Sequence, residues 1–273
     1  MSTSLSTSLS PASTHAPPAS RDWLRRYGPE RPRAAARLVC FPHAGGGASF
    51  YRRWAALLPE TYDHLAVQYP GREDRIGEES AGAMGPLADR IAEALTPLAD
   101  RPLILFGHSM GASIAYEVAR RLQEHGRTPH HLVVSSRLSP SRERPGTVHL
   151  LDDEAFLREL AAFGGISQEV LRHRELRDLV LRPMRSDYRL IETYQPTATP
   201  ALECPVTAVR GDQDHSHPAG ELRAWAEVAG DDFRLVTLPG DHFYLASRTR
   251  ELIELLLPRF APEPVPGGAL PVS

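Results

Sequence analysis

Short apolar runs alternate with longer amphipathic stretches along most of the chain. Six of the runs are continuous in apolar residues, have the length of strands and are bounded by glycine, proline or charged residues. They are Arg37–Phe41, His64–Tyr69, Leu103–Gly107, His131–Ser136, Val206–Arg210 and Phe233–Leu238. Continuous rather than alternating apolarity is typical of parallel strands that are buried on both faces of a sheet.

Helical spacing of apolar residues follows most of these runs. The expected helices are Ser49–Leu58, Met84–Leu98, Met110–His125, Ala219–Ala229 and Tyr244–Phe260. Strands that alternate with helices are joined by right-handed crossovers, which place helices on both faces of a sheet. The pattern therefore predicts an α/β fold with a mostly parallel, doubly wound sheet.

The stretch from about residue 138 to residue 200 breaks this alternation. It contains no good strand pattern but shows helical spacing over Asp153–Phe163 and Leu176–Tyr194. Ligands of open α/β sheets bind at the carboxyl ends of the strands. We therefore expect this insertion to form a helical lid over that end of the sheet.

One ordered domain is expected over residues 23–260. Residues 1–22 are rich in Ser, Thr, Pro and Ala and lack the basic and apolar segments of a signal peptide. Residues 261–273 are rich in proline and glycine. Both ends are predicted to be disordered tails.

Composition excludes several classes of function. The formal net charge is -3, whereas a general nucleic-acid binder carries a strong basic excess. The chain has no lysine, which excludes a P-loop and an enzyme that forms a Schiff base on its own lysine. Cys40 and Cys204 are expected to be reduced, buried thiols of a cytoplasmic protein. No apolar run reaches the roughly 18 residues of a membrane span.

The sharpest local motif is Gly107-His108-Ser109-Met110-Gly111, between an expected strand and an expected helix. This context is that of a nucleophile elbow, a tight turn that presents the Ser109 hydroxyl above the sheet. The turn is crowded, so the positions on either side of it must be small, as Gly107 and Gly111 are. Ser109 is therefore the candidate nucleophile.

A serine nucleophile needs a histidine base and a carboxylate that orients it, and in this fold they follow in the order acid, then histidine. His242 lies in the loop after the last expected strand. Two carboxylates, Asp212 and Asp214, follow the preceding strand. We favour Asp214, because Gly211 would make a turn that brings the chain back toward the site. Asp212 would then stabilise the turn.

The reaction also requires donors for the oxyanion of the tetrahedral intermediate. One is the backbone N–H of the residue after the nucleophile, Met110, and the other comes from the loop after an early strand. Phe41-Pro42-His43-Ala44-Gly45-Gly46-Gly47 is that loop, and the Ala44 N–H is its natural donor. A phosphate-binding loop is the alternative, but the glycines lack G-x-G-x-x-G spacing.

A metal site is the other alternative for these residues. His43, His108 and His242 could converge, and residues 212–217 are rich in possible ligands. Neither H-E-x-x-H nor a matched Cys/His spacing is present. We therefore expect neither a metal nor a cofactor.

Together, five motifs resemble the type II thioesterases of polyketide and nonribosomal peptide biosynthesis, from about residue 36 to residue 256. The motifs are Phe41-Pro42-His43-Ala44-Gly45-Gly46, Tyr69-Pro70-Gly71-Arg72-Glu73, Gly107-His108-Ser109-Met110-Gly111, Gly211-Asp212-Gln213-Asp214 and Gly240-Asp241-His242-Phe243. The resemblance implies an α/β-hydrolase with a helical lid. It also implies hydrolysis of acyl groups from the phosphopantetheine arm of acyl or peptidyl carrier proteins. Carried over, the triad is Ser109, Asp214 and His242, with Ala44 and Met110 as oxyanion donors.

Substrate and partner are less sharply indicated. Leu176, Val180, Met184, Tyr188 and Ile191 share one face of the expected lid helix, where they could line an acyl pocket or pack the lid onto the body. Six arginines between residues 172 and 189 could dock an acidic carrier protein or form a solvated helix face.

Neither nucleic acid nor a membrane is expected as a partner, and a monomer is expected. The alternatives are a free-standing esterase or lipase, and a binding protein of the same fold without catalysis.

Overall fold

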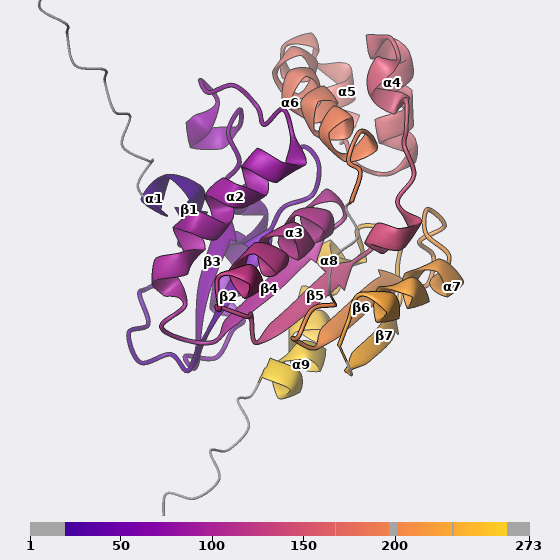
Figure 1. Cartoon of the computed structure of the whole chain (residues 1–273). Helices are drawn as coiled ribbons and strands as arrows, with labels where there is room; N and C mark the ends of the chain where they lie inside the picture. The colour runs from indigo at the N-terminus through magenta and orange to yellow at the C-terminus, as the bar shows by residue number, and fades with distance from the viewer. Residues whose placement is uncertain (1–19, 167, 197–200, 231, 261–273) are drawn as a thin grey trace, which may run out of the picture.

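A seven-stranded sheet forms the centre of the molecule (Figure 1). The computed structural model describes residues 20–166, 168–196, 201–230 and 232–260. In spatial order the strands are β1 (Leu24–Arg25), β3 (Tyr62–Val67), β2 (Ala36–Phe41), β4 (Leu103–His108), β5 (His131–Ser135), β6 (Val206–Gly211) and β7 (Phe233–Leu238). Only β1 runs antiparallel to its neighbour, and the other strand pairs are parallel. The predicted α/β fold is confirmed.

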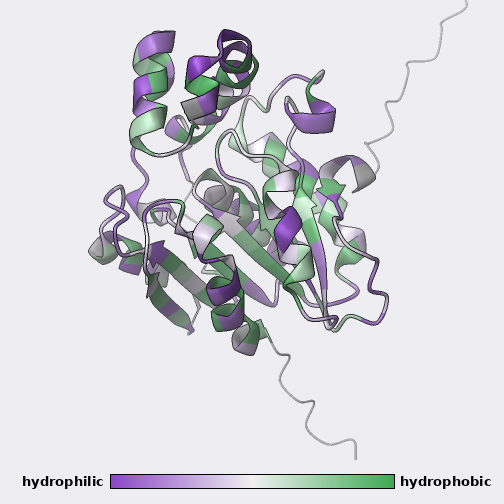
Figure 2. Ribbon diagram, turned by 180° about the vertical axis from the view of Figure 1, so that it is seen from behind, coloured by the Kyte–Doolittle hydropathy of each residue, from purple (hydrophilic) through white to green (hydrophobic). Residues whose placement is uncertain are grey.

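Both faces of the sheet are covered, as the continuous apolar runs predict. Successive residues of β2 belong to different cores: Val39 packs into one, and Cys40 packs into the other. The first core contains residues of α2 (Met84–Leu95) and α3 (Met110–Glu124). The second contains residues of the 3₁₀ helix η1 (Ala48–Ala56), α8 (Tyr244–Ser247) and α9 (Thr249–Phe260). Figure 2 shows the hydrophobic strands between these layers.

Several elements differ from their predicted form. The stretch expected as helix Ser49–Leu58 is the 3₁₀ helix η1. The stretch Ala219–Ala229 divides into α7 (Ala219–Leu222) and the 3₁₀ helix η6 (Arg223–Glu227). The last expected helix is interrupted at Arg248, between α8 and α9. The 3₁₀ helix η3 (Thr96–Leu98) continues α2, whereas η2 (Glu73–Arg75), β1 and α1 (Ser20–Trp23) were not predicted.

A helical insertion between β5 and β6 stands over one end of the sheet (Figure 1). Its elements are η4 (Pro140–Arg142), η5 (Val148–Leu150), α4 (Asp153–Ala162), α5 (Gln168–Arg172) and α6 (Arg174–Glu192). The predicted helical insertion is confirmed, and α5 is an additional short helix. Asp152 caps α4 by accepting a hydrogen bond from Ala155 N at 2.8 Å.

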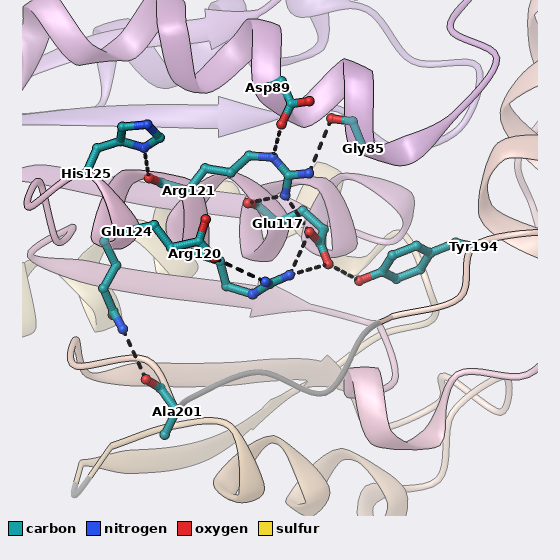
Figure 3. Close-up of polar contacts among 10 residues, drawn as sticks. Gly85, Asp89, Glu117, Arg120, Arg121, Glu124, His125, Tyr194 and Ala201 are labelled. Carbon is teal, nitrogen blue, oxygen red and sulfur yellow. Dashed lines mark hydrogen bonds and ion pairs between the residues drawn. The ribbon is translucent and has the colours of Figure 1, made fainter.

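The end of the insertion is tied to α3 through a buried carboxylate (Figure 3). The Tyr194 hydroxyl donates to Glu117 Oε1 at 2.6 Å. Arg120 and Arg121 donate to the same carboxylate, so the buried charge of Glu117 is compensated. After residues 197–200 in the sequence, Ala201 O accepts a hydrogen bond of 3.1 Å from the Gln123 amide. Helix α3 therefore holds the chain on both sides of that segment.

Three further expectations concern the cysteines, a membrane and the tails. Cys40 and Cys204 are buried and free, and burial raises the pKa of the Cys204 thiol to about 12. Among the described residues, no helix has the length and apolarity to cross a membrane. The predicted tails lie outside the described residues, except that Ser20 to Asp22 begin helix α1.

Candidate active site

Ser109 occupies the turn between β4 and α3 in a conformation that few side chains adopt. Its backbone has φ 53° and ψ -123°. Such a conformation costs on the order of 1–3 kcal/mol and persists only where the surroundings impose it. Here Ser109 N donates to Ser135 O at 2.8 Å, and Ser109 O accepts from Ala112 N at 2.9 Å. These bonds hold the turn in the tight form expected of a nucleophile elbow.

The glycines on either side of Ser109 are required by close backbone packing. A Cβ at Gly107 would overlap the carbonyl of Gly111. A Cβ at Gly111 would overlap the carbonyl oxygens of Phe41 and Pro42. The helix that begins at the elbow therefore packs closely against the end of β2, where the candidate oxyanion loop starts.

This crowding predicts that Gly111→Ala destabilises the protein, although alanine favours a helix by about 1 kcal/mol over glycine. Overpacking of this kind costs about 1–3 kcal/mol. Gly85 is a matched control, because it is also the second residue of its helix and a Cβ there meets only Arg121 Nη2 at 3.7 Å. Denaturant unfolding should give opposite signs for Gly111→Ala and Gly85→Ala. A stabilised Gly111→Ala variant would contradict the packing argument.

The structure brings His242 and Asp214 together. His242 Nδ1 lies 3.0 Å from Asp214 Oδ2, and the Asp214 side chain is buried. The Ser216 hydroxyl donates to Asp214 Oδ1 and lies 3.3 Å from His242 Nδ1. Burial alone raises the pKa of the Asp214 carboxyl, but the hydrogen bonds and charge of His242 and the Ser216 hydrogen bond outweigh it. The pKa therefore lies below its ordinary value, and Asp214 is ionised at neutral pH.

Asp212 lies elsewhere and has a structural contact. It is exposed, and its Oδ1 accepts a hydrogen bond from Gly240 N at 2.9 Å. Gly211 ends strand β6 and opens the expected turn, which is closed by a hydrogen bond of 3.3 Å from Asp214 N to Gly211 O. A Cβ at Gly211 would overlap the carbonyls of Gly240 and Asp241, so this glycine lets the loop of His242 approach β6. A second turn follows at Asp214, whose Oδ1 accepts from Ser216 N at 3.1 Å.

The two expected oxyanion donors lie at the same cavity as Ser109 and His242. Met110 is the first residue of α3, so its N–H has no acceptor within the helix. Ala44 is the second residue of a turn closed by a hydrogen bond of 3.0 Å from Gly46 N to His43 O. Gly45 has φ 74°, the conformation that a type II turn requires at its third position.

Three other histidines surround the site in their neutral form. Burial, followed by the nearby charge of His242, lowers the pKa of His43 to about 4. Burial likewise lowers the pKa of His217 to about 4 and that of His108 well below its ordinary value. His108 Nδ1 is bonded to the Ser135 hydroxyl at 2.9 Å. Among the described residues, no group of three or more His, Cys, Asp or Glu side chains could hold a metal ion.

The cavity over Ser109 has a volume of about 280 Å³ and is mostly apolar. The insertion covers the cavity with side chains from η5, from α4 and the residue that caps its C-terminus, and from α6. These apolar residues are Val148, Leu160, Phe163, Met184, Tyr188 and Ile191. Of the expected lid-helix face, Met184, Tyr188 and Ile191 line the cavity, whereas Leu176 and Val180 do not.

The arginines of the lid helix lie apart from this cavity. Arg182, Arg185 and Arg189 line a separate groove of about 990 Å³, together with residues 76–80. The two cavities share no lining residue. Arg185 is also engaged inside the insertion, where it donates to Leu151 O at 2.6 Å and to Asp153 Oδ1 at 2.6 Å. Docking of a carrier protein on the arginines between residues 172 and 189 stays a prediction.

Sequence reasoning missed the role of Ser216 and gave none to Arg72. Ser216 follows Asp214 by two residues, and an aspartate that folds back on the second residue after it is a recognisable turn signal. Arg72 belongs to the Pro-Gly-Arg-Glu motif, and its guanidinium is buried against Asp187 of α6. Local sequence holds no signal for that pairing, since 115 positions separate the two residues.

Comparison with known proteins identifies the family. The thioesterase domain family matches residues 36–260. Thioesterase PikA5 of Streptomyces venezuelae is 42% identical over 250 residues, which cover 88% of this chain and 88% of that protein. Gramicidin S biosynthesis protein GrsT of Aneurinibacillus migulanus is 36% identical over 225 residues, covering 82% and 88% of the two chains.

Solved structures agree with this result. The type II thioesterase BorB from the borrelidin biosynthetic cluster superimposes with a TM-score of 0.82 at 42% identity, covering 88% of this chain and 98% of that one. YbtT, a type II thioesterase from the yersiniabactin pathway, gives a TM-score of 0.80 at 30% identity, covering 87% and 98%. The chain therefore belongs to the thioesterase family of hydrolases, among the type II thioesterases of polyketide and nonribosomal peptide biosynthesis.

Proposed function

We propose that the protein hydrolyses acyl groups from the phosphopantetheine arm of acyl or peptidyl carrier proteins and so clears stalled or misprimed units from a synthase. The single observation that carries this proposal is that Ser109, His242 and the two candidate oxyanion donors line one small apolar cavity. Its volume of about 280 Å³ suits a short acyl group, because pockets that bind drug-sized ligands have volumes of about 300–1,000 Å³.

The proposed reaction proceeds through an acyl-enzyme on Ser109. His242 accepts the proton of the Ser109 hydroxyl while the oxygen attacks the thioester carbonyl. The N–H groups of Ala44 and Met110 donate to the oxyanion, and collapse of the intermediate expels the pantetheine thiolate, which takes the proton from His242. His242 then deprotonates a water that attacks the acyl-enzyme, and collapse of this second intermediate breaks the bond to Ser109 Oγ, which takes the proton back from His242 as the free acid leaves. Asp214 holds Nδ1 of His242, so Nε2 is the nitrogen that serves the nucleophile.

The proposal places the enzyme in the cytoplasm as a monomer. The free, buried thiols of Cys40 and Cys204 support a reducing compartment. A role in such a biosynthetic pathway is supported by YbtT, which comes from the yersiniabactin NRPS/PKS pathway, and by GrsT, a gramicidin S biosynthesis protein.

The test compares three substrates that carry the same acyl group: acyl-carrier protein, acyl-pantetheine and a simple ethyl ester. We expect kcat/KM for the carrier-bound thioester to exceed that for the ester by a factor of about 10 or more, which corresponds to at least about 1.4 kcal/mol of transition-state stabilisation. Acyl-pantetheine separates the contribution of the carrier from that of the thioester. An ester hydrolysed as fast as the carrier-bound thioester would instead support a free-standing esterase.

A further inference from the structure

The C-terminal half of the lid helix α6 rests directly on the candidate oxyanion loop. A Cβ at Gly45 would overlap the Met184 side chain, so helix and loop are in close contact there. Met184 and Asp187 are buried, whereas the N-terminal half of α6 is more exposed and includes Leu179, which is 56% exposed. Helix α6 stands above the sheet with the rest of the insertion (Figure 1). Only its C-terminal half is therefore positioned to act on the loop.

Asp187 is the polar link between them. Its carboxylate forms a two-pronged ion pair with Arg72, in which Nη2 and Oδ1 are 2.7 Å apart. The side chains of Arg72 and Asp187 are only 6% and 4% exposed. Oδ2 of Asp187 also accepts a hydrogen bond from Gly45 N at 2.8 Å. One carboxylate thus binds a buried guanidinium and the backbone of the loop together.

The Gly45 N–H lies at the centre of the turn that carries the Ala44 N–H. The bond from Gly46 N to His43 O closes this turn, and His43 O belongs to the same peptide plane as the Ala44 N–H. Glycine at Gly45 allows the central peptide to rotate at little cost. The bond to Asp187 removes that freedom, because it holds the Gly45 N–H in one direction.

The Tyr69-Pro70-Gly71-Arg72-Glu73 motif also holds this loop. Arg72 Nη1 donates to Gly46 O at 3.3 Å, and the Tyr69 hydroxyl donates to Pro42 O at 3.2 Å. Glu73 accepts from Ser49 N at 3.3 Å. The motif therefore fixes the two flanks of the loop, and Asp187 fixes its centre.

We propose that Asp187 is a positioning residue for the oxyanion hole: held by Arg72, its carboxylate orients the turn that presents the Ala44 N–H, so that the hole is complete only while the C-terminal half of α6 is seated on the body. This inference rests on the proposed role of Ala44. It gives the insertion a part in transition-state stabilisation besides that of enclosing the substrate.

Two substitutions test the proposal on a small acyl-thioester. Asp187→Asn leaves Arg72 without its counter-charge and weakens the anchor of Gly45. The double variant Arg72→Met with Asp187→Leu removes both charges, and replacing a buried ion pair by apolar residues is often neutral for stability. Neither variant changes a residue that lines the cavity of Ser109.

We expect both variants to lower kcat by about 10- to 100-fold with KM within about twofold, since loss of a whole oxyanion donor costs about 10²–10³ in kcat. Phosphonylation of Ser109 by a fluorophosphonate should slow in parallel, because its phosphoryl oxygen occupies the same hole. Tyr194→Phe is the control: it removes the hydrogen bond of 2.6 Å to Glu117 that anchors the same end of the insertion away from the loop. It should lower Tm and leave kcat unchanged.

The comparison of Tm with kcat decides the outcome. A double variant with the Tm of the wild type and a reduced kcat supports the proposal, as does a folded Asp187→Asn variant with reduced kcat and unchanged KM. Wild-type kcat in either folded variant would overturn it and leave the ion pair a structural contact. Ser109→Ala, assayed on the same substrate, separates this result from failure of the proposed function: residual activity in that variant would remove the serine mechanism itself.

Discussion

Ser109→Ala is expected to abolish hydrolysis of acyl-thioesters while the protein stays folded. Loss of the nucleophile from a serine triad costs on the order of 10⁶ in kcat. Alanine adopts the backbone conformation of the elbow, φ 53°, at a similar cost to serine, and the bonds that hold the turn are made by backbone atoms. The measurement is kcat on acyl-carrier protein and acyl-pantetheine, with Tm recorded for both proteins.

Ser113 provides the matched control for this experiment. It is a buried serine of α3, the helix that begins directly after Ser109; its hydroxyl donates to Glu143 at 3.3 Å, and it does not line the cavity. Ser113→Ala should therefore keep its activity. Incubation with an acyl-thioester should add the mass of one acyl group to the wild type and to Ser113→Ala but not to Ser109→Ala. A Ser109→Ala variant within tenfold of the wild-type rate would exclude the acyl-enzyme mechanism.

Asp214→Asn is expected to reduce kcat on the order of 10⁴, the cost of losing the carboxylate that orients the histidine of a serine triad. An asparagine can present its NH₂ group to His242 Nδ1, which favours the tautomer that protonates Nε2 and blocks its action as a base. The bond of 3.0 Å between His242 Nδ1 and Asp214 Oδ2 is the contact that the substitution alters.

Asp212→Asn is the paired control, because the two aspartates are two positions apart in one loop. The Asp212 side chain accepts a hydrogen bond from Gly240 N at its exposed position, and an asparagine oxygen can accept the same bond. This variant should keep nearly all of its activity and lose about 1 kcal/mol of stability or less. If Asp212→Asn is the inactive variant and Asp214→Asn the active one, the assignment of the acid is wrong.

Five of the six predicted strands, β2 to β6, are buried, and they were predictable because burial on both faces produces a continuous apolar run in the sequence. The sixth, β7, lies at the edge of the sheet and is only partly buried. β7 has the predicted bounds Phe233–Leu238, and β3 lies two residues earlier than expected. β1 escaped prediction because a strand of two residues has no measurable period. The sequence also did not predict that η1 is a 3₁₀ helix rather than an α-helix. The hydrogen bonds of these two helices differ in span by one residue, and both helices place apolar residues on similar faces.

The sequence by itself determined the elbow of Ser109 and the loop position of His242, because each depends on a neighbouring strand and on glycines that a crowded turn requires. Only the tertiary structure decided which aspartate meets His242, since Asp212 and Asp214 differ in the path of one loop that Ser216 and Gly240 constrain. It alone also brought Asp187 to Arg72 and to the candidate oxyanion loop. Contacts between distant positions follow from how whole helices pack, and no local pattern of residue types records them.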